Sequence, residues 1–159
     1  MIVVSDTSPI TNLLRIGRIN ILRDLFETVI IPDAVFREIN VLEHQRTEIL
    51  KYDWIRVASL TNHDLFDELI EKVDPGEAEA ISLSVELSAT LLLIDESAGR
   101  SEAERIGLEV TGLIGVLIRA KDKGLIKRVG PELIKLVDEA GFWISDGLIR
   151  NVLNQIGED

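Results

Sequence analysis

Short apolar runs alternate with longer amphipathic segments along the chain. Residues 2–5, 28–31, 54–58 and 90–94 are rich in β-branched residues or leucine and are bounded by residues that break regular structure. Such runs are typical of strands in a parallel sheet whose two faces are both covered. Between them, apolar residues recur every three or four positions, which is the spacing of a helix that packs one face on a core. The pattern therefore predicts alternating strands and helices.

Proline and glycine indicate where the predicted helices begin and end. Ser8 followed by Pro9 predicts an N-cap and a first helical residue, and apolar positions then recur at helical spacing on both sides of Gly17. Pro32 opens the next helix in the same way. Further helices are predicted over residues 63–72, 74–87, 97–107, 112–123, 130–140 and 146–156.

This alternation predicts an α/β fold, a three-layer α/β/α sandwich around a mainly parallel sheet of about four or five strands. No linker, repeat or low-complexity stretch divides the 159 residues, so we expect a single domain over residues 1–159. Residues 126–159 are helical in pattern. The sequence leaves open whether these C-terminal helices pack on the core or on another chain.

The composition excludes several classes of protein. A chain of this length buries roughly 70% of the surface that it exposes when unfolded, so it needs no disulfide or structural metal to fold. It contains no cysteine, which excludes zinc fingers, iron–sulfur clusters and thiol nucleophiles. Its longest apolar runs, such as 91–94, are far shorter than the roughly 18 residues of a membrane span, and residues 1–6 lack the basic region of a signal peptide. We therefore expect a cytoplasmic protein with no membrane partner.

The charge balance limits how a nucleic acid could bind. The 28 acidic and 17 basic side chains leave a formal charge of −11, and phosphate contacts depend on lysine and arginine, so any nucleic-acid partner requires a local basic surface. The densest basic stretch contains Arg119, Lys121 and Lys123. These residues either guide RNA or form a solvated helix end, where the helix dipole favours cations. Trp54 and Trp143 are interpreted as core or interface aromatics rather than base-stacking platforms.

Two acidic residues directly follow predicted strands. Asp6 follows the run 2–5, and Asp95 follows the run 91–94. Ligands of open α/β sheets collect at the carboxyl ends of the strands, so these carboxylates converge if their strands are neighbours, and such a pair favours a divalent cation. Two further candidates are Glu38, in the helix that Pro32 opens, and Glu77, in the first turn of the helix over 74–87.

Each of these acids also has a purely structural interpretation. Asp74 and Glu77 have the spacing of a capping box. Glu38 follows Arg37 and is consistent with a solvated helix face. Asp6 and Asp95 have the positions of residues that cap the next helix. Periodicity and spacing alone therefore leave the function open.

Four ordered segments resemble the motifs of the PIN domain, a family of small metal-dependent nucleases that includes the VapC toxins. Residues 16–22 and 110–117 also resemble a less studied prokaryotic branch of that family, and the resemblance covers about residues 1–125. The four segments are Val4-Ser5-Asp6-Thr7-Ser8-Pro9, Ile30-Ile31-Pro32-Asp33-Ala34-Val35-Phe36-Arg37-Glu38-Ile39, Gly76-Glu77-Ala78-Glu79-Ala80-Ile81 and Leu92-Leu93-Ile94-Asp95.

The resemblance implies an acidic quartet that holds metal and carries catalysis. Its members would be Asp6, Glu38, Glu77 and Asp95. Many family members carry aspartate at the third position, and the longer glutamate of this chain moves that carboxylate outward by about one bond length. Three supporting roles are implied as well: Ser8 positions water or the Asp6 carboxylate, Glu96 stands where a further acid is variable, and Arg100 grips phosphate.

The ligands available indicate Mg²⁺ or Mn²⁺, because the chain offers carboxylate oxygens, no thiols and only two histidines, His44 and His63, both expected on the surface. The resemblance then implies an endoribonuclease that hydrolyses phosphodiester bonds of single-stranded or structured RNA and leaves a 5′-phosphate and a 3′-hydroxyl. It also implies the toxin of a toxin–antitoxin pair, with a small antitoxin protein as partner, and a homodimer.

Two other enzyme classes with acids at strand ends are disfavoured. A phosphotransfer receiver domain needs paired acids after its first strand, and a haloacid dehalogenase-like phosphatase needs an aspartate where this chain has Ser8. The alternative from another class is a PIN-fold module that binds a protein partner and does not cut. Its support is the net charge of −11, which suits a basic partner, whereas the presence of all four acids opposes it.

Overall fold

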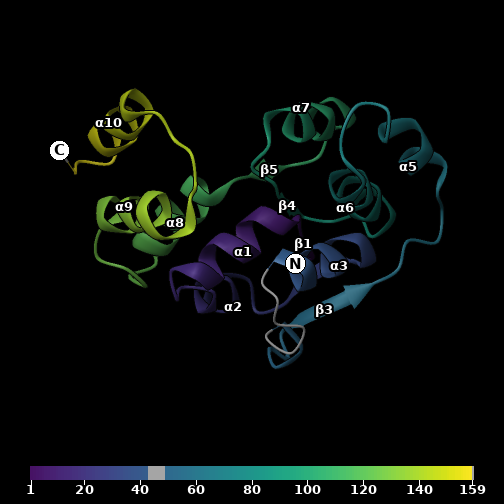
Figure 1. Ribbon diagram of the computed structural model, residues 1–159, viewed down its shortest axis with the longest axis horizontal. Helices are drawn as coiled ribbons and strands as arrows, with labels where there is room; N and C mark the ends of the chain where they lie inside the picture. Colours follow the sequence, from purple (N-terminus) through teal and green to yellow (C-terminus); the bar gives the residue numbers. More distant parts are fainter. Residues whose placement is uncertain (43–48, 159) are drawn as a thin grey trace.

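The computed structural model describes residues 1–42 and 49–158, so the expectation for His44 lies outside the described residues. Within them, five parallel strands form one sheet in the order β3-β2-β1-β4-β5 (Figure 1). In the register of the sheet, Val4 lies opposite Ile30 on one side and Leu92 on the other. The strands are β1 (Val3–Ser5), β2 (Val29–Pro32), β3 (Ile55–Ala58), β4 (Leu91–Leu93) and β5 (Val110–Thr111).

Helices cover both faces of this sheet (Figure 1). One apolar cluster joins the sheet to α1, α2, α3, α8 and α9, and a second joins its other face to α5, α6 and α7. The three-layer α/β/α fold is thereby confirmed. The described helices are α1 (Thr7–Arg15), α2 (Asn20–Phe26), α3 (Asp33–Leu42), α5 (Asp64–Leu69), α6 (Pro75–Glu86), α7 (Ser97–Ile106), α8 (Leu113–Asp122), α9 (Val129–Ala140) and α10 (Asp146–Gln155).

Alternate residues of the central strands supply the two apolar clusters. Val3 and Leu93 belong to the first, and Val4 and Leu92 to the second; none of the four is more than 1% exposed. Burying one such side chain contributes about 1.5–3 kcal/mol, and a slip of one residue would turn each strand's side chains to the opposite face. The continuous apolar runs of the sequence therefore have a direct cause: both faces of the sheet are buried.

The start of the first helix differs from the sequence prediction. Ser8 was expected as the N-cap and Pro9 as the first helical residue, but α1 begins at Thr7 and Asp6 occupies the N-cap in an extended conformation. Pro9 is thus the third residue of α1. Proline is tolerated there because the first four N–H groups of a helix have no acceptor within the helix.

Two further elements depart from the predicted pattern. The prediction contained no strand at β5, because a strand of two residues is too short to form a recognisable apolar run. The helix predicted over 63–72 is shorter, since α5 ends at Leu69. The N–H groups of Lys72 and Val73 both donate to the Leu69 carbonyl, at 2.9 and 3.0 Å, and this turn leads into α6.

The C-terminal helices pack on the core of the same chain, which answers the question that the sequence left open. α9 packs against α1 and α8, and α10 packs against α9. Arg18, between α1 and α2, donates two hydrogen bonds of 2.8 and 3.2 Å to the carboxylate of Glu132 in α9. Glu132 is only 4% exposed, so this charge pair fixes α9 to the first helices. None of the described helices is long and apolar enough to cross a membrane.

The carboxylate of Glu158 closes the C-terminal part of the fold. It accepts hydrogen bonds from the backbone N–H groups of Val129 (2.8 Å) and Gly130 (2.9 Å), at the start of α9, and from Nζ of Lys121 (2.8 Å). Burial by itself would raise the pKa of Glu158, but these donors outweigh it and lower the pKa to about 2. A carboxylate at this position is favoured by the unpaired N–H groups and the dipole of a helix N-terminus.

Glu158→Gln is expected to destabilise the fold, because the amide group must turn an N–H toward one of the three donors. Losing hydrogen bonds to a buried charge costs about 1–3 kcal/mol, which for a chain of this size lowers the Tm by about 2–10 °C. Thermal unfolding followed by circular dichroism measures the shift. Glu139→Gln, on the exposed side of α9, is the matched control, and an equal Tm for both variants would contradict the assignment.

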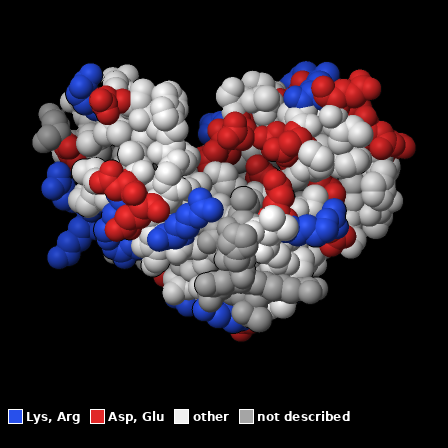
Figure 2. All heavy atoms as spheres, viewed as in Figure 1, with Lys and Arg blue, Asp and Glu red and all other residues white. Residues whose placement is uncertain are grey.

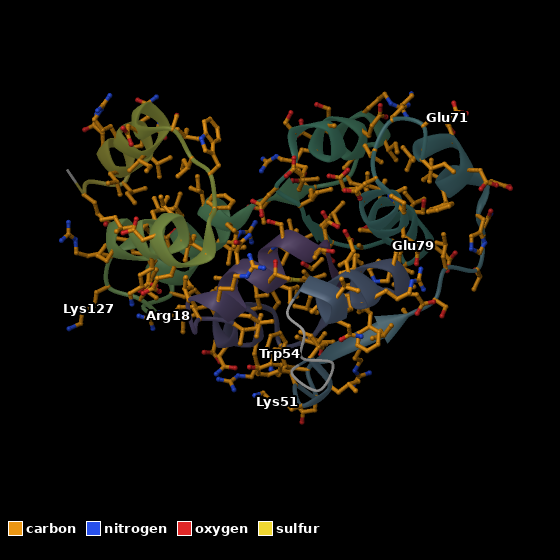
Figure 3. All side chains as sticks on the ribbon, in the orientation of Figure 1. Arg18, Lys51, Trp54, Glu71, Glu79 and Lys127 are labelled. Atoms are coloured by element: carbon orange, nitrogen blue, oxygen red, sulfur yellow. The ribbon has the colours of Figure 1, made fainter. Side chains whose placement is uncertain are left out.

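The two tryptophans lie in different environments. Trp54 is 7% exposed and packs against Tyr52 with ring centroids 5.7 Å apart, among the side chains that Figure 3 shows near β3. Trp143 is 84% exposed. The expectation of a core or interface aromatic is therefore confirmed for Trp54 as a core residue, whereas Trp143 is not a core residue and an interface role for it stays a prediction. His63 is exposed, as expected.

Candidate functional site

The candidate site lies where the chain leaves the two central strands. β1 and β4 are neighbours, and successive connections run away from this point toward opposite edges of the sheet. Such a switch point opens a crevice at the carboxyl ends of the strands. The N–H of Asp6 donates to the Leu93 carbonyl at 2.9 Å. This hydrogen bond places Asp6 beside the end of β4, next to the residues that lead into Asp95. The condition that the sequence analysis set, that these two strands be neighbours, is therefore met.

Asp6 is one of two deeply buried acids of the crevice, at 5% exposed. Desolvation raises the pKa of its carboxyl to about 8, against the opposing effect of the Thr7 backbone N–H. Repulsion by Glu77, Asp74 and Glu38 raises this pKa further. A carboxyl that resists ionisation among other acids is the electrostatic condition that a bound cation would relieve.

Glu38 approaches Asp6 from α3. Its Oε2 accepts a 2.8 Å hydrogen bond from the Thr7 hydroxyl, so the residue that follows Asp6 orients the second acid. A Cβ atom at Gly76 would collide with the same oxygen, so any other residue there would displace the Glu38 carboxylate from this position. Because of these contacts, Glu38 is not simply a solvated side chain on the helix surface.

Glu77 takes part in the capping box that its spacing allowed. Its backbone N–H donates to Oδ1 of Asp74 (2.8 Å), and its own Oε2 accepts from the Asp74 N–H (3.1 Å). Glu77 is also 4% exposed, and desolvation, followed by repulsion from Asp74, raises its pKa to about 7. Glu77 therefore forms the predicted capping box through its Oε2. Its carboxylate also belongs to the acidic group around Asp6.

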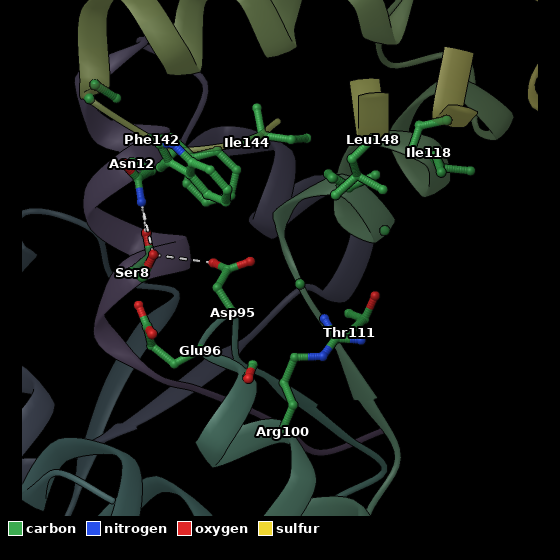
Figure 4. Close-up of a pocket in the computed structure, with 18 of the residues that line it drawn as sticks. Ser8, Asn12, Asp95, Glu96, Arg100, Thr111, Ile118, Phe142, Ile144 and Leu148 are labelled. Atoms are coloured by element: carbon green, nitrogen blue, oxygen red, sulfur yellow. Dashed lines mark hydrogen bonds between the residues drawn. The ribbon is translucent and has the colours of Figure 1, made fainter. Parts of the chain in front are cut away.

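Asp95 is held by a different set of contacts. Its Oδ1 accepts from the backbone N–H of Leu113 (2.8 Å), at the start of α8, and its Oδ2 accepts from the Ser8 hydroxyl (3.2 Å; Figure 4). Desolvation raises the pKa of Asp95, opposed by these two hydrogen bonds and by the charge of Arg100. Ser8 was expected to position water or the Asp6 carboxylate; its hydroxyl donates instead to Asp95, and a role toward water stays a prediction.

Two polar residues of the site escaped the sequence analysis. Asn12 is 7% exposed, and its amide donates 2.9 Å hydrogen bonds to both the hydroxyl and the carbonyl of Ser8, so Figure 4 shows a chain from Asn12 through Ser8 to Asp95. Thr7 orients Glu38 as described. The available signal was a group of polar side chains in an otherwise apolar helix, spaced one turn apart at Ser8 and Asn12.

Glu96 and Arg100 stand at the edge of the same crevice. Glu96 is exposed, and its charge raises the pKa of both Glu77 and Asp95. Arg100 is half-buried, and a Cβ at Gly112 would lie 2.9 Å from its Nη1 and 2.6 Å from Oδ1 of Asp95. The close approach of α7 to the start of α8 thus places one cation beside the carboxylate that ends β4.

A divalent cation fits this site in donor chemistry and only partly in geometry. The donors are carboxylate oxygens in a buried crevice, which suits Mg²⁺ or Mn²⁺. The raised pKa values of Asp6 and Glu77 arise first from desolvation and then from repulsion by neighbouring acids, and a bound cation would counter both effects. Among residues 1–42 and 49–158, however, no three acids or histidines are arranged as a ready set of metal ligands. The internal hydrogen bonds of Glu38, Glu77 and Asp95 explain this, since each already occupies one or more carboxylate oxygens.

The crevice continues into a groove of about 1020 Å³. Figure 2 shows it as a hollow between α10 and α7, with acidic side chains gathered on the side of α6 and α7. Ser8, Asp95 and Arg100 line one part of the groove, and residues 140–144 line another. The groove therefore extends from Asp95, at the end of β4, to the connection between α9 and α10.

The basic stretch of the sequence lies at the other end of α8. Leu113, the first residue of α8, contacts Asp95, whereas Arg119, Lys121 and Lys123 follow roughly 9–15 Å further along the helix axis. Lys121 forms an ion pair with Glu158, and Figure 3 shows Lys127 at the outer edge of the molecule. The structure does not bring these cations to the acids, and their contact with RNA stays a prediction.

The fold and the crevice together define an α/β domain with an acidic centre at the switch point of a parallel sheet. The sequence matches the PIN-domain family DUF3368 over residues 2–158, and the chain belongs to the PIN-domain family. The match extends past the residues 1–125 expected from the motifs and includes the C-terminal helices. No curated protein matches the sequence. PIN domains are generally nucleases and typically use divalent metal ions.

Proposed function

We propose that the protein is a metal-dependent endoribonuclease whose centre is formed by Asp6, Glu38, Glu77 and Asp95. The observation that carries the proposal is the buried carboxyl of Asp6, whose pKa is raised to about 8 among neighbouring acids. A fold stabilised only by its core has no need for such repulsion. The membership in a family of nucleases supports the same function.

Each residue of the crevice has a distinct role in this proposal. Asp6 and Asp95 would hold the ion directly, with Glu38 and Glu77 binding it directly or through water. When bound, a divalent ion supplies an activated water and stabilises the oxygen that leaves the phosphodiester. Ser8 and Asn12 keep the Asp95 carboxylate oriented through their hydrogen bonds, and Thr7 does the same for Glu38.

The electrostatics of the crevice also assign a role to Arg100. A phosphate that enters the groove meets the acids at the strand ends, which repel it, and the guanidinium of Arg100, which attracts it. A planar guanidinium binds phosphate oxygens with two parallel hydrogen bonds. We assign Arg100 to the phosphate next to the bond that is cleaved, and Glu96, on the exposed rim, to the outer part of the metal site.

The biological setting that the motifs suggested remains part of the proposal. The protein would act in the cytoplasm as the toxin of a toxin–antitoxin pair, inhibited by a small antitoxin protein, and would form a homodimer. The net charge of −11 suits a partner with a basic surface. Co-expression of the neighbouring reading frame with the chain, followed by size-exclusion chromatography, tests both the antitoxin and the oligomeric state.

The proposal predicts that the purified protein cleaves a 5′-labelled single-stranded RNA in the presence of Mn²⁺ or Mg²⁺. The products are expected to carry 5′-phosphate and 3′-hydroxyl ends, because the attacking oxygen comes from water. Denaturing gel electrophoresis separates them, and EDTA is expected to stop the reaction. Products with 2′,3′-cyclic phosphate ends, or cleavage that persists in EDTA, would contradict the proposal and indicate a different nuclease.

A protein-binding module without activity is the second candidate. It is favoured by one observation, the lack of a ready set of three metal ligands among residues 1–42 and 49–158. It requires that the acids keep their internal hydrogen bonds when Mn²⁺ is added. No change in Tm at millimolar Mn²⁺, together with no cleavage, would establish this candidate over the nuclease.

A further inference from the structure

We propose that Trp143 is a base-stacking position and that the groove between α7 and α10 takes single-stranded RNA. The inference rests on the proposed function and names the form of its substrate and a residue that holds it. The sequence pattern alone favoured a core or interface role for Trp143, and the structure changes this, because the indole is 84% exposed and lies in the wall of the groove.

The exposure of Trp143 follows from the local chain direction. Residues 142–144 connect α9 to α10, and their burial alternates: Phe142 is half-buried against the core, Trp143 is exposed, and Ile144 is 9% exposed. Figure 4 shows Phe142 and Ile144 side by side at one end of the groove. Two apolar neighbours that pack inward force the indole between them outward, so its faces are left without packing from the core.

The connection that carries Trp143 is held at both ends. Gly141 ends α9 with φ 70°, and the N–H of Phe142 donates to the Leu136 carbonyl at 2.9 Å. Ser145 caps α10 by accepting the Leu148 N–H at 3.1 Å. The backbone on each side of the indole is thus fixed by helix caps. A stacking platform requires this, since a ring on a free loop would lose more conformational entropy on binding.

The same groove offers the partner that a stacked nucleotide needs for its phosphate. Arg100 lines the groove beside Asp95, and Arg15 lines it next to residue 140, whose carbonyl accepts its Nη1 at 3.3 Å. Proteins that bind single strands combine cations along the backbone with aromatic rings under the bases. The groove brings together the Trp143 indole, the Arg100 guanidinium and one of the candidate catalytic acids, Asp95, in a single hollow of about 1020 Å³.

Stacking on Trp143 also specifies a single strand. In a duplex the faces of the bases are covered by their neighbours, so an aromatic side chain reaches a base face only in an unpaired strand, a loop or an end. A paired stem would have to open before one of its bases could lie on the indole. The structure therefore favours the single-stranded alternative among the RNA substrates that the sequence left open.

Binding is measured with a fluorescein-labelled octamer of 2′-O-methyl uridine, which the proposed reaction does not cleave, in buffer with EDTA. The expected result is quenching of the Trp143 emission, which is absent in Trp143→Phe, where only the buried Trp54 emits. Anisotropy of the label should show an affinity about 5- to 150-fold lower for Trp143→Ala, the range for loss of one stacked base. Trp143→Phe retains a ring and is expected to keep most of the affinity.

Ile134→Ala is the matched control, because Ile134 is 59% exposed on α9 and does not line the groove. Its affinity is expected to equal that of the wild type. In cleavage of an unmodified octamer with Mn²⁺, Trp143→Ala should raise KM and leave kcat nearly unchanged, since the indole binds the strand away from the reacting bond. A pre-formed RNA duplex of the same length is expected to leave the Trp143 emission unchanged.

The outcomes separate this inference from the proposed function. Wild-type cleavage with equal KM for Trp143→Ala would overturn the stacking position and leave the nuclease intact. Binding and quenching without cleavage would support the groove and overturn the nuclease. Quenching by an arginine-rich decapeptide and not by the octamer would overturn the inference in favour of a basic protein partner.

Discussion

Asp6→Asn is expected to abolish metal-dependent RNA cleavage by the protein, with a loss of at least about 100-fold. Asparagine keeps the shape of the side chain and removes the charge that would bind the ion, and a lost metal contact is worth several kcal/mol in the reaction. The fold should persist, because Asp6 makes no side-chain cap to α1. Initial rates on a labelled single-stranded RNA measure the effect, and circular dichroism spectra verify the fold.

Asp138→Asn serves as the control, since Asp138 is exposed near the end of α9 and is expected to leave the rate unchanged. Both variants should be purified in the same way, because a contaminating ribonuclease would give them equal rates. If Asp6→Asn cleaves as fast as the wild type under these conditions, Asp6 is not part of the catalytic centre and the proposed metal site is wrong.

The metal-free protein is expected to lose stability as the pH rises from about 4 to about 8. The pKa of Asp6 is raised from 3.8 to about 8 and that of Glu77 from 4.5 to about 7, so the folded state binds more protons than the unfolded state throughout this range. The free energy of unfolding then decreases as the pH rises. Its slope against pH is proportional to the number of protons bound by the unfolded state minus the number bound by the folded state, which is negative here. The stabilisation that the raised pKa values of Asp6 and Glu77 provide is complete below about pH 4 and is lost by about pH 8.

Glu158 acts in the opposite direction at the acidic end. Its pKa is lowered from 4.5 to about 2, so the stability that it provides is present above about pH 4.5 and is lost as the pH falls toward 2. The optimum in EDTA is therefore expected near pH 4, where the gain from Glu158 balances the loss from Asp6 and Glu77. Thermal melts at half-unit intervals measure this profile, and a Tm that is constant or rises between pH 5 and 8 would contradict the raised pKa values.

Mn²⁺ is expected to abolish the fall of the Tm between about pH 5 and pH 8. At pH 7.5 the ion must displace protons from Asp6 and Glu77, so binding raises the Tm by several degrees and releases protons. Titration calorimetry in two buffers of different ionisation enthalpy counts the protons. Asp6→Asn should show a flatter pH profile in EDTA and a smaller response to Mn²⁺, and identical responses in wild type and variant would assign the metal effect to another site.

The sequence was sufficient for the architecture because burial on both faces of the sheet leaves a strong pattern. The runs at 2–5 and 90–94 form the neighbouring strands β1 and β4, so the acids that follow them lie at adjacent strand ends beside the switch point. The end of a strand is defined by the chain itself, so Asp6 and Asp95 were recognisable from their immediate neighbours. β5 was missed because two residues carry too little pattern.

The side-chain contacts of the site were not recognisable in the same way. Ser8 lies two residues after Asp6, yet its hydroxyl donates to Asp95, which is 87 residues distant along the chain. Asn12 and Thr7 were overlooked because helix periodicity shows only where apolar residues lie. It gives no information about which buried polar side chains form hydrogen bonds. The sequence could not decide between a core and an interface position for Trp143 for a related reason: a single aromatic in a short connection has no periodicity, and only the packing of its neighbours determines its direction.

The acids of the candidate centre come from the ends of β1 and β4 and from α3 and α6, and Asp95 receives its last hydrogen bond from Leu113. A chain still emerging from the ribosome, with fewer than these residues outside the exit tunnel, therefore holds its acids on separate segments and has no assembled pocket. For the proposed nuclease, the ribosome would have to synthesise the chain past Leu113, and move that residue out of the tunnel, before the enzyme could cut its own messenger.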